Sequence, residues 1–220
     1  MKTILSNSAS TLAFRLLWLA TPVGFLSCAW ATDIQVKVAD QRGRPIEGAV
    51  VWVDEPAKNL SPLDVEISQK NRQFHPEVTV IPVGSKVRFP NRDSVQHHVY
   101  SFSPAKSFDI PLYIGEAANP VTFDRPGVVT LGCNIHDWMS ASILILETIR
   151  FTKTNASGIA TLKDLPASTR ALKIWHPRLR GDPVAWTPEE GESASQAAVT
   201  LTLRPAFPRT PPQDEGGTYR

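Results

Sequence analysis

Cysteine is scarce in this sequence, which limits how the fold can be stabilised. Only Cys28 and Cys133 occur among the 220 residues. The N-terminal segment that carries Cys28 is expected to be removed, so the remaining chain cannot form an internal disulfide. A lone thiol in an oxidising compartment is reactive unless it is buried or bound to a metal. Cys133 therefore requires one of these two kinds of protection.

The chain also lacks an apolar run long enough for a good membrane span. Its N-terminal run, Leu16–Leu26, is short, whereas a spanning helix needs about 20 apolar residues. Lys2 and Arg15 precede this run, and a small-x-small motif ending at Ala31 follows it. This order is typical of a secretory signal peptide over residues 1–31. We expect export to the periplasm and no membrane span.

A lipoprotein signal is the less favoured alternative for the same segment. In that case Cys28 would be the lipidated residue. Phe25-Leu26-Ser27 is a poor match to the residues that precede such a cysteine. Cleavage after Ala31, which removes Cys28, is the preferred interpretation.

Neither sign of charge dominates after that cleavage. The full chain has 23 Lys and Arg against 21 Asp and Glu, and residues 1–31 contain two of the basic residues, Lys2 and Arg15, and no acidic one. The remaining chain is therefore close to neutral. It lacks the positive field on which nucleic-acid-binding proteins depend, so we expect no nucleic-acid partner.

Helical periodicity is absent as well, and short strand-like segments take its place. No run of ten or more residues follows a 3.6-residue period, and the 19 prolines argue against a helical bundle. The strand-like segments lie at residues 34–38, 49–53, 78–83, 86–89, 97–102, 120–123, 128–133, 141–146, 151–155, 159–162, 171–175 and 197–203. Short strands separated by turn residues predict an all-β sandwich fold.

Four stretches carry no clear strand pattern. Residues 59–73 are polar and are predicted to form a linker. Residues 103–119 are predicted to be irregular, apart from a short apolar element near residues 110–114. Residues 177–194 are polar and rich in proline and glycine. Residues 205–220 contain four prolines and mixed charges, which predicts a disordered tail.

Three candidate metal ligands lie in the segment Gly132–Ser140. Cys133, His136 and Met139 are separated by two residues each, on the connection between two predicted strands. A short loop tied at both ends to a sheet would hold these side chains with little freedom. A metal bound there would reorganise little on changing its oxidation state, which suits electron transfer.

A fourth ligand would come from His97 or His98 on an earlier strand. Successive side chains of a strand point to opposite faces, so only one of the two can be the ligand, and the pattern alone does not say which. One thiolate, two imidazoles and a thioether are the ligand set of a blue-copper site. Zinc is less favoured, because methionine is a poor zinc ligand and structural zinc sites prefer several cysteines. We therefore expect one copper ion.

The middle of the chain resembles the cupredoxins, the plastocyanin and amicyanin group in particular. Phe89-x-Asn91 followed by His97-x-Val99 is similar to the family's first-histidine strand, in which the ligand stands six residues after the asparagine. The resemblance therefore selects His97. Pro126-Gly127 is similar to the start of the strand that leads into the copper cysteine.

The loop spacing adds to this resemblance and implies a role for each ligand. Two residues between each pair is similar to the short amicyanin-type loop. His97 and His136 would be the equatorial imidazoles, Cys133 the thiolate, and Met139 the weak axial ligand of a type 1 copper. The resemblance covers roughly residues 78–146.

The flanking segments resemble a different family. Residues 40–51 and 154–175 are similar to the two halves of a carboxypeptidase-regulatory-like, or transthyretin-like, β-sandwich. The resemblance implies a cupredoxin domain over residues 61–146, inserted into a second sandwich formed by residues 32–60 and 147–204. The combination resembles exported bacterial proteins labelled methylamine-utilisation or plastocyanin-like.

Three functions are compatible with these features. The favoured one is a periplasmic one-electron carrier between a redox donor and acceptor, such as a cytochrome or a dehydrogenase, docking near Ile135 and Trp138. An enzyme is disfavoured, because multicopper oxidases place histidines on both sides of the copper cysteine, whereas Gly132 and Asn134 flank it here. The third is a copper-handling protein, or a partner- or carbohydrate-binding one, with a structural or vestigial copper site.

Overall fold

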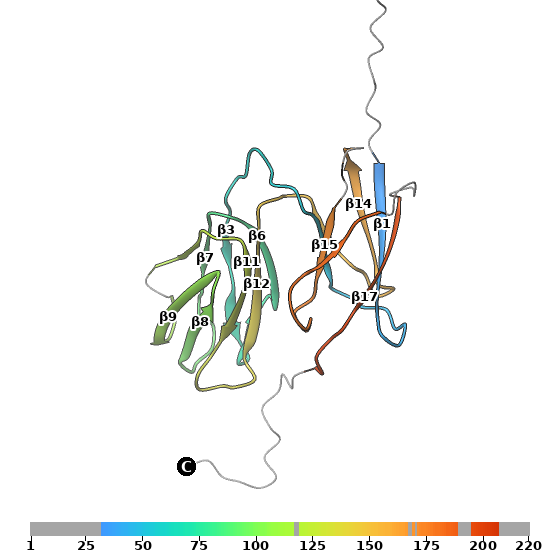
Figure 1. The fold of residues 1–220 in the computed structure, drawn as a ribbon. Helices are drawn as coiled ribbons and strands as arrows, with labels where there is room; N and C mark the ends of the chain where they lie inside the picture. The colour runs from blue at the N-terminus through green and yellow to red at the C-terminus, as the bar shows by residue number, and fades with distance from the viewer. Residues whose placement is uncertain (1–31, 117–118, 167–168, 170, 189–194, 207–220) are drawn as a thin grey trace, which may run out of the picture.

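The computed structural model describes residues 32–116, 119–166, 169, 171–188 and 195–206 (Figure 1). The predicted signal peptide, residues 1–31, lies outside the described residues, and so does the predicted tail apart from its first two residues. In the part of the chain that the structure describes, no helical segment is long and apolar enough to cross a membrane.

The described residues form strands and no helices, so the predicted all-β class is confirmed. The strands are β1 (Thr32–Asp40), β2 (Val50–Val53), β3 (Asp64–Glu66), β4 (Ser68–Lys70), β5 (Gln73–His75), β6 (Val78–Pro82), β7 (Ser85–Arg88), β8 (His97–Ser103), β9 (Lys106–Tyr113), β10 (Val121–Phe123), β11 (Gly127–Gly132), β12 (Ser140–Leu146), β13 (Phe151–Lys153), β14 (Ile159–Leu165), β15 (Leu172–Trp175), β16 (Val184–Trp186) and β17 (Gln196–Leu201).

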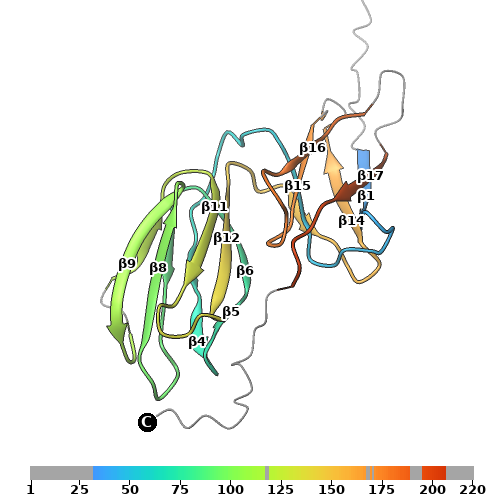
Figure 2. The same cartoon turned by 60° about the horizontal axis from the view of Figure 1, so that its bottom comes forward.

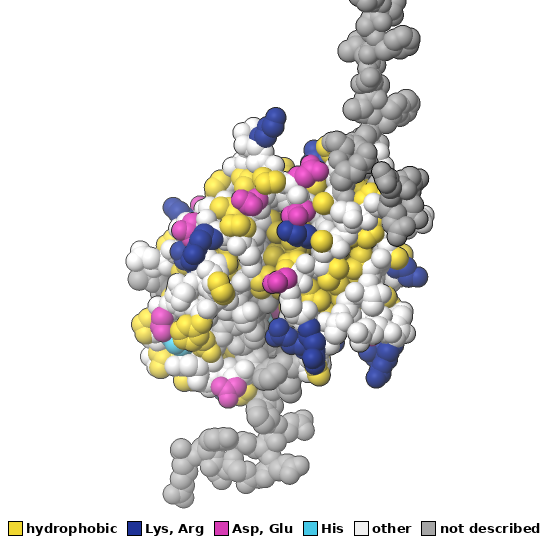
Figure 3. All heavy atoms as spheres, in the orientation of Figure 1, with side chains coloured by type: hydrophobic (Ala, Val, Ile, Leu, Met, Phe, Trp, Pro, Cys, Tyr) yellow, Lys and Arg dark blue, Asp and Glu magenta, His cyan; other side chains and the backbone are white. Residues whose placement is uncertain are grey.

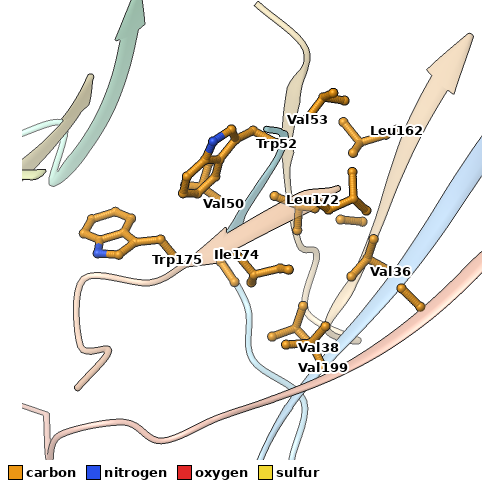
Figure 4. Packing of buried hydrophobic residues seen from close by; sticks show 14 of the residues in the cluster. Val36, Val38, Val50, Trp52, Val53, Leu162, Leu172, Ile174, Trp175 and Val199 are labelled. Atoms are coloured by element: carbon orange, nitrogen blue, oxygen red, sulfur yellow. The ribbon is translucent and has the colours of Figure 1, made fainter. Parts of the chain in front are cut away.

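The first two strands and the last five form two sheets with a common core. The strand orders are β14-β1-β17 and β13-β2-β15-β16. Val36 and Val38 of β1 and Val199 of β17 pack against Ile174 of β15 in this core (Figure 4). β1 alternates buried and exposed residues, as expected of a strand with one face on the core.

The ten strands in the middle of the chain form three further sheets. Their orders are β10-β7-β3, β6-β12-β11-β8-β9 and the hairpin β4-β5. A second core lies among them, with Phe89, Phe123 and Ile143 fully buried. Figures 1 and 2 show these strands beside those of the first core. The division into an inserted sandwich and a host sandwich nonetheless stays a prediction.

β12 contributes to both cores, which explains the apolar run from Ile143 to Leu146 in its second half. Ile143 and Ile145 belong to the second core, whereas Leu144 and Leu146 belong to the first. Alternate side chains of a strand face opposite sides, so a strand covered on both faces has no polar face. Trp52, which belongs to the first core, lines a cavity of about 580 Å³ together with Leu144.

Charged side chains of both signs are dispersed on one face of the molecule (Figure 3). On the face drawn in Figure 3, Lys and Arg side chains alternate with Asp and Glu, and neither sign covers a large area. On this face the charge is spread in space, and in the full sequence the 23 Lys and Arg residues nearly balance the 21 Asp and Glu residues.

The predicted linker at residues 59–73 is wrong, because it contains strands. β3 pairs parallel with β7, and β4 pairs with β5 in a hairpin. Ile67, between β3 and β4, is fully buried. Each of these strands has only three residues, which is too short for an alternating pattern to stand out from a polar background.

Two other segments in which no strand was predicted, residues 103–119 and 177–194, contain strands at sheet edges. β9 pairs with β8 from Ser103↔Lys106 to His97↔Tyr113. It carries Pro111, which lowers the expectation of a strand, but an edge strand tolerates a missing N–H group. β16 is a three-residue edge strand within the polar segment 177–194.

A buried threonine links two turns of the first core and provides a stability test. The Thr154 hydroxyl donates to the Ile46 carbonyl oxygen at 2.6 Å and accepts from the Ala49 N–H group at 2.9 Å. Thr154→Val leaves both backbone groups without this partner. We expect a loss of about 1–3 kcal/mol in the free energy of unfolding, measured with urea. The exposed Thr200→Val should change it by no more than about 0.5 kcal/mol; equal effects would contradict the assignment.

Candidate metal centre

The loop that carries three of the predicted ligands closes a regular hairpin. β11 and β12 pair antiparallel from Gly127↔Ile145 to Gly132↔Ser140. Cys133 follows directly after β11, and Met139 directly precedes β12. The Met139 N–H group donates to the His136 carbonyl oxygen at 2.9 Å, which tightens the loop. The sheet thus fixes both ends of the segment, as its spacing predicts.

The fourth predicted ligand comes from the neighbouring strand. His97 is the first residue of β8, which pairs with β11 at Gly132↔Tyr100. The candidate ligand atoms of His97, Cys133 and His136 all lie within 4.8 Å of one another. The Cys133 Sγ to His136 Nδ1 distance is 3.7 Å. The fold therefore brings together residues that are 36 positions apart in sequence.

The site is buried on most sides. His97 is 0 % exposed, Cys133 is 3 % exposed and Met139 is 1 % exposed. His136 is only partly buried. Three side chains are thus shielded from solvent, and the fourth reaches toward the surface.

An unpartnered nitrogen on His97 shows that the donor set fits a metal. The Nε2 atom of His97 lies 2.7 Å from Asp93 Oδ2, whereas its Nδ1 atom is buried and has no hydrogen-bond partner. Leaving a buried polar atom without a partner costs about 1–3 kcal/mol. A metal held also by Cys133 and His136 would satisfy that lone pair. Thiolate and imidazole ligands together suit copper.

Met139, the predicted axial ligand, is buried close to Cys133. Its side chain lies in the same buried cluster as Cys133. Both residues line one pocket of about 400 Å³. Coordination by the thioether stays a prediction.

His98, the alternative to His97, points elsewhere. Its Nε2 atom lies 2.8 Å from Asp109 Oδ1, and its ring packs against that of Tyr100 with centroids 5.2 Å apart. Its Nδ1 atom also lacks a partner. Among the described residues, however, His98 belongs to no group of three or more His, Cys, Asp or Glu residues that could hold a metal.

The electrostatic surroundings of the site favour the neutral imidazole of His136 and the ionised carboxylate of Asp93. Burial lowers the pKa of His136, and the nearby His97 and Arg72 lower it further, so its imidazole is neutral at neutral pH. For Asp93, burial opposes ionisation, but hydrogen bonds from the Arg72 N–H group, His97 and the Asn71 N–H group outweigh it. These bonds hold the pKa of Asp93 below its usual value.

Asp93 is the residue at this site that sequence reasoning missed. It lies in the segment Asn91–Ser94, whose polar side chains are typical of a turn. Part of that expectation is confirmed, because the Asp93 N–H group donates to Asn91 Oδ1 at 2.9 Å. The contact with His97, four residues on, has no sequence signal of its own, since it depends on how the turn folds back over β8.

Comparisons with known proteins match part of this chain. No protein-family model and no curated protein matches it. Among solved structures, a purple cupredoxin from Nitrosopumilus maritimus matches at 24 % identity and a TM-score of 0.33, over 38 % of this chain and 100 % of that one. Amicyanin from Paracoccus versutus matches at 17 % identity and a TM-score of 0.33, over 42 % of this chain and 86 % of that one.

A copper enzyme is also similar to part of the chain. A copper-containing nitrite reductase from Thermus scotoductus matches at 25 % identity and a TM-score of 0.37, over 52 % of this chain and 28 % of that one. This chain thus spans about a quarter of the reductase. All of these TM-scores are low, and the function proposed for the chain depends on the site geometry instead.

Proposed function

We propose that this protein binds one type 1 copper ion and carries single electrons between redox proteins in the periplasm. One observation carries the proposal: a cysteine sulfur and the nitrogens of two imidazoles lie within 4.8 Å of one another at the end of a regular hairpin. His97, Cys133 and His136 would hold the metal, with Met139 as a weak fourth ligand. Bound copper would supply reversible one-electron exchange.

The surroundings of the site favour a carrier over an enzyme. Among the described residues, His97, Cys133 and His136 are the one group of three or more His, Cys, Asp or Glu side chains placed to hold a metal. His97 and Cys133 are shielded from solvent, while Ile135 beside His136 is 48 % exposed. An electron would leave through the His136 edge, where an apolar surface suits the small, transient contacts of redox partners.

Redox cycling separates this function from copper storage. The copper-loaded protein should lose its visible absorption when ascorbate is added and regain it fully on re-oxidation, over repeated cycles. We expect this reversibility because the hairpin would hold the ligands in the same places in both oxidation states of the copper. Copper that cannot be re-oxidised, or that is released on reduction, would contradict the carrier function and favour the copper-handling alternative.

The domain arrangement is also a proposal. We infer that residues 61–146 form a cupredoxin unit inserted into a transthyretin-like host of residues 32–60 and 147–204. Two core clusters, which share only the strand β12 among their buried members, support this division. So does the fact that the sheets of the first core contain only β1, β2 and β13–β17.

The signal-peptide assignment over residues 1–31 predicts where the exported protein begins. In a bacterial host with a functional secretion system, the protein recovered from the periplasm should begin at Thr32, because the small-x-small motif ends at Ala31. N-terminal sequencing and intact mass measure this directly. An Ala31→Leu variant should accumulate uncleaved. A mass that retains residues 1–31, or a lipid-modified Cys28, would contradict the assignment.

A further inference from the structure

The buried histidine of the site is held by a carboxylate that is itself firmly held. Asp93 Oδ2 lies 2.7 Å from Nε2 of the fully buried His97. An ionised carboxylate can only accept a hydrogen bond, so Nε2 must carry the proton. In a neutral imidazole, Nδ1 then carries the lone pair. That is the buried nitrogen without a partner.

A hairpin turn from a different sheet fixes the position of Asp93. The Asn71 and Arg72 N–H groups donate to Asp93 Oδ1 and Oδ2 at 2.7 and 2.9 Å. These two residues join β4 to β5, and both have φ of 55°, as the type I′ turn of a two-residue hairpin requires. Two successive N–H groups therefore point at one carboxylate.

The other side of the Asp93 turn is fixed as well. Asn91 is buried, and its side-chain amide donates to the carbonyl oxygens of Val95 and Tyr113, at 2.8 Å in each case. Its Oδ1 atom accepts the Asp93 N–H group. The carboxylate thus has its orientation set before any metal binds.

We propose that Asp93 is a positioning residue of the metal site, which selects the His97 tautomer with a free Nδ1 lone pair and aims it at Cys133 and His136. The proposal rests on the proposed copper function for its metal, although its effect on His97 precedes metal binding. Carboxylates that accept from a ligand histidine fix the ring and raise its basicity. The added negative charge favours copper(II) over copper(I).

The chain contains a matched control on the same strand. His98 Nε2 lies 2.8 Å from Asp109 Oδ1, so it forms a second Asp–His pair one residue along β8. This pair lies outside the group of candidate ligands. Asp109→Asn replaces a carboxylate that contacts a histidine Nε2, as Asp93→Asn does, but the histidine concerned is His98 and not His97.

The first experiment reads the His97 tautomer in the metal-free protein by nitrogen-15 NMR. In the wild-type protein, His97 should be a single tautomer with a protonated Nε2. In Asp93→Asn it should populate both tautomers, because an amide can donate as well as accept. Asp109→Asn should leave His97 unchanged. A His97 tautomer that is the same in Asp93→Asn as in the wild type would overturn the proposal, whatever the protein does with copper.

The second experiment measures copper(II) affinity by competition with a chelator of known affinity. Asp93→Asn should bind copper(II) about 10- to 100-fold more weakly than the wild type, the usual cost of losing such a partner. Asp109→Asn should bind it with wild-type affinity. Equal losses in the two variants would overturn the proposal. If the wild type bound no copper, the proposed function would fail, while the NMR result would still decide the role of Asp93.

Discussion

Cys133→Ser is expected to abolish the intense visible absorption of the copper-loaded protein. That absorption comes from charge transfer between a thiolate sulfur and copper(II), and a serine hydroxyl stays protonated at neutral pH. Copper(II) affinity should fall by at least about 100-fold, since losing a ligand should cost more than losing the partner of one. Visible spectroscopy with a chelator competition measures both effects.

A neighbouring substitution controls for damage to the loop. Asn134 is exposed and lies beside Cys133, so Asn134→Ser introduces the same side chain without removing a ligand. This variant should keep the absorption and bind copper within a few-fold of the wild type. A coloured Cys133→Ser protein would show that the absorption does not come from Cys133. A colourless Asn134→Ser protein would show that any disturbance of the loop removes the absorption, whether or not a ligand is lost.

His97→Gln is expected to weaken copper binding by about 100-fold or more, whereas His98→Gln should leave it nearly unchanged. Only His97 lies with Cys133 and His136 inside the 4.8 Å group. Glutamine approximates the size of histidine but offers a poor ligand for copper. The two positions are adjacent on β8, so they share the same strand context.

The measurement for this pair is a copper titration followed by electron paramagnetic resonance. The spectrum of His98→Gln should match that of the wild type, with the metal held by a thiolate. His97→Gln should give either no bound copper or a spectrum without that character. The reverse result, with His98→Gln as the damaged variant, would place the ligand on the outer face of β8 and contradict the structure.

The ligand loop was the most predictable part of the site. The spacing of Cys133, His136 and Met139 is local, so it indicates the ligand set without knowledge of the fold. The choice between His97 and His98 is not local. Strand alternation shows only that they point apart, and a resemblance to a family was needed to prefer His97, which the structure places at the site.

The residues that surround and hold His97 could not be predicted from local spacing. Asp93 contacts His97 because a hairpin more than twenty residues upstream, at Asn71 and Arg72, holds its carboxylate. That hairpin lies in a segment predicted to be a linker, since its strands have three residues each. Short strands carry little periodic signal, and here the turn between two of them holds the carboxylate that contacts His97.

Copper(II) titration of the wild-type protein tests the central claim most directly. One equivalent of copper(II) should produce a single intense visible band that saturates at one copper per chain and disappears on reduction. The reason is that one cysteine sulfur and two imidazoles converge at a single site, where His97 and Cys133 are buried. A protein that stays colourless at one equivalent, or that takes up several equivalents with no thiolate-to-copper band, would contradict the account.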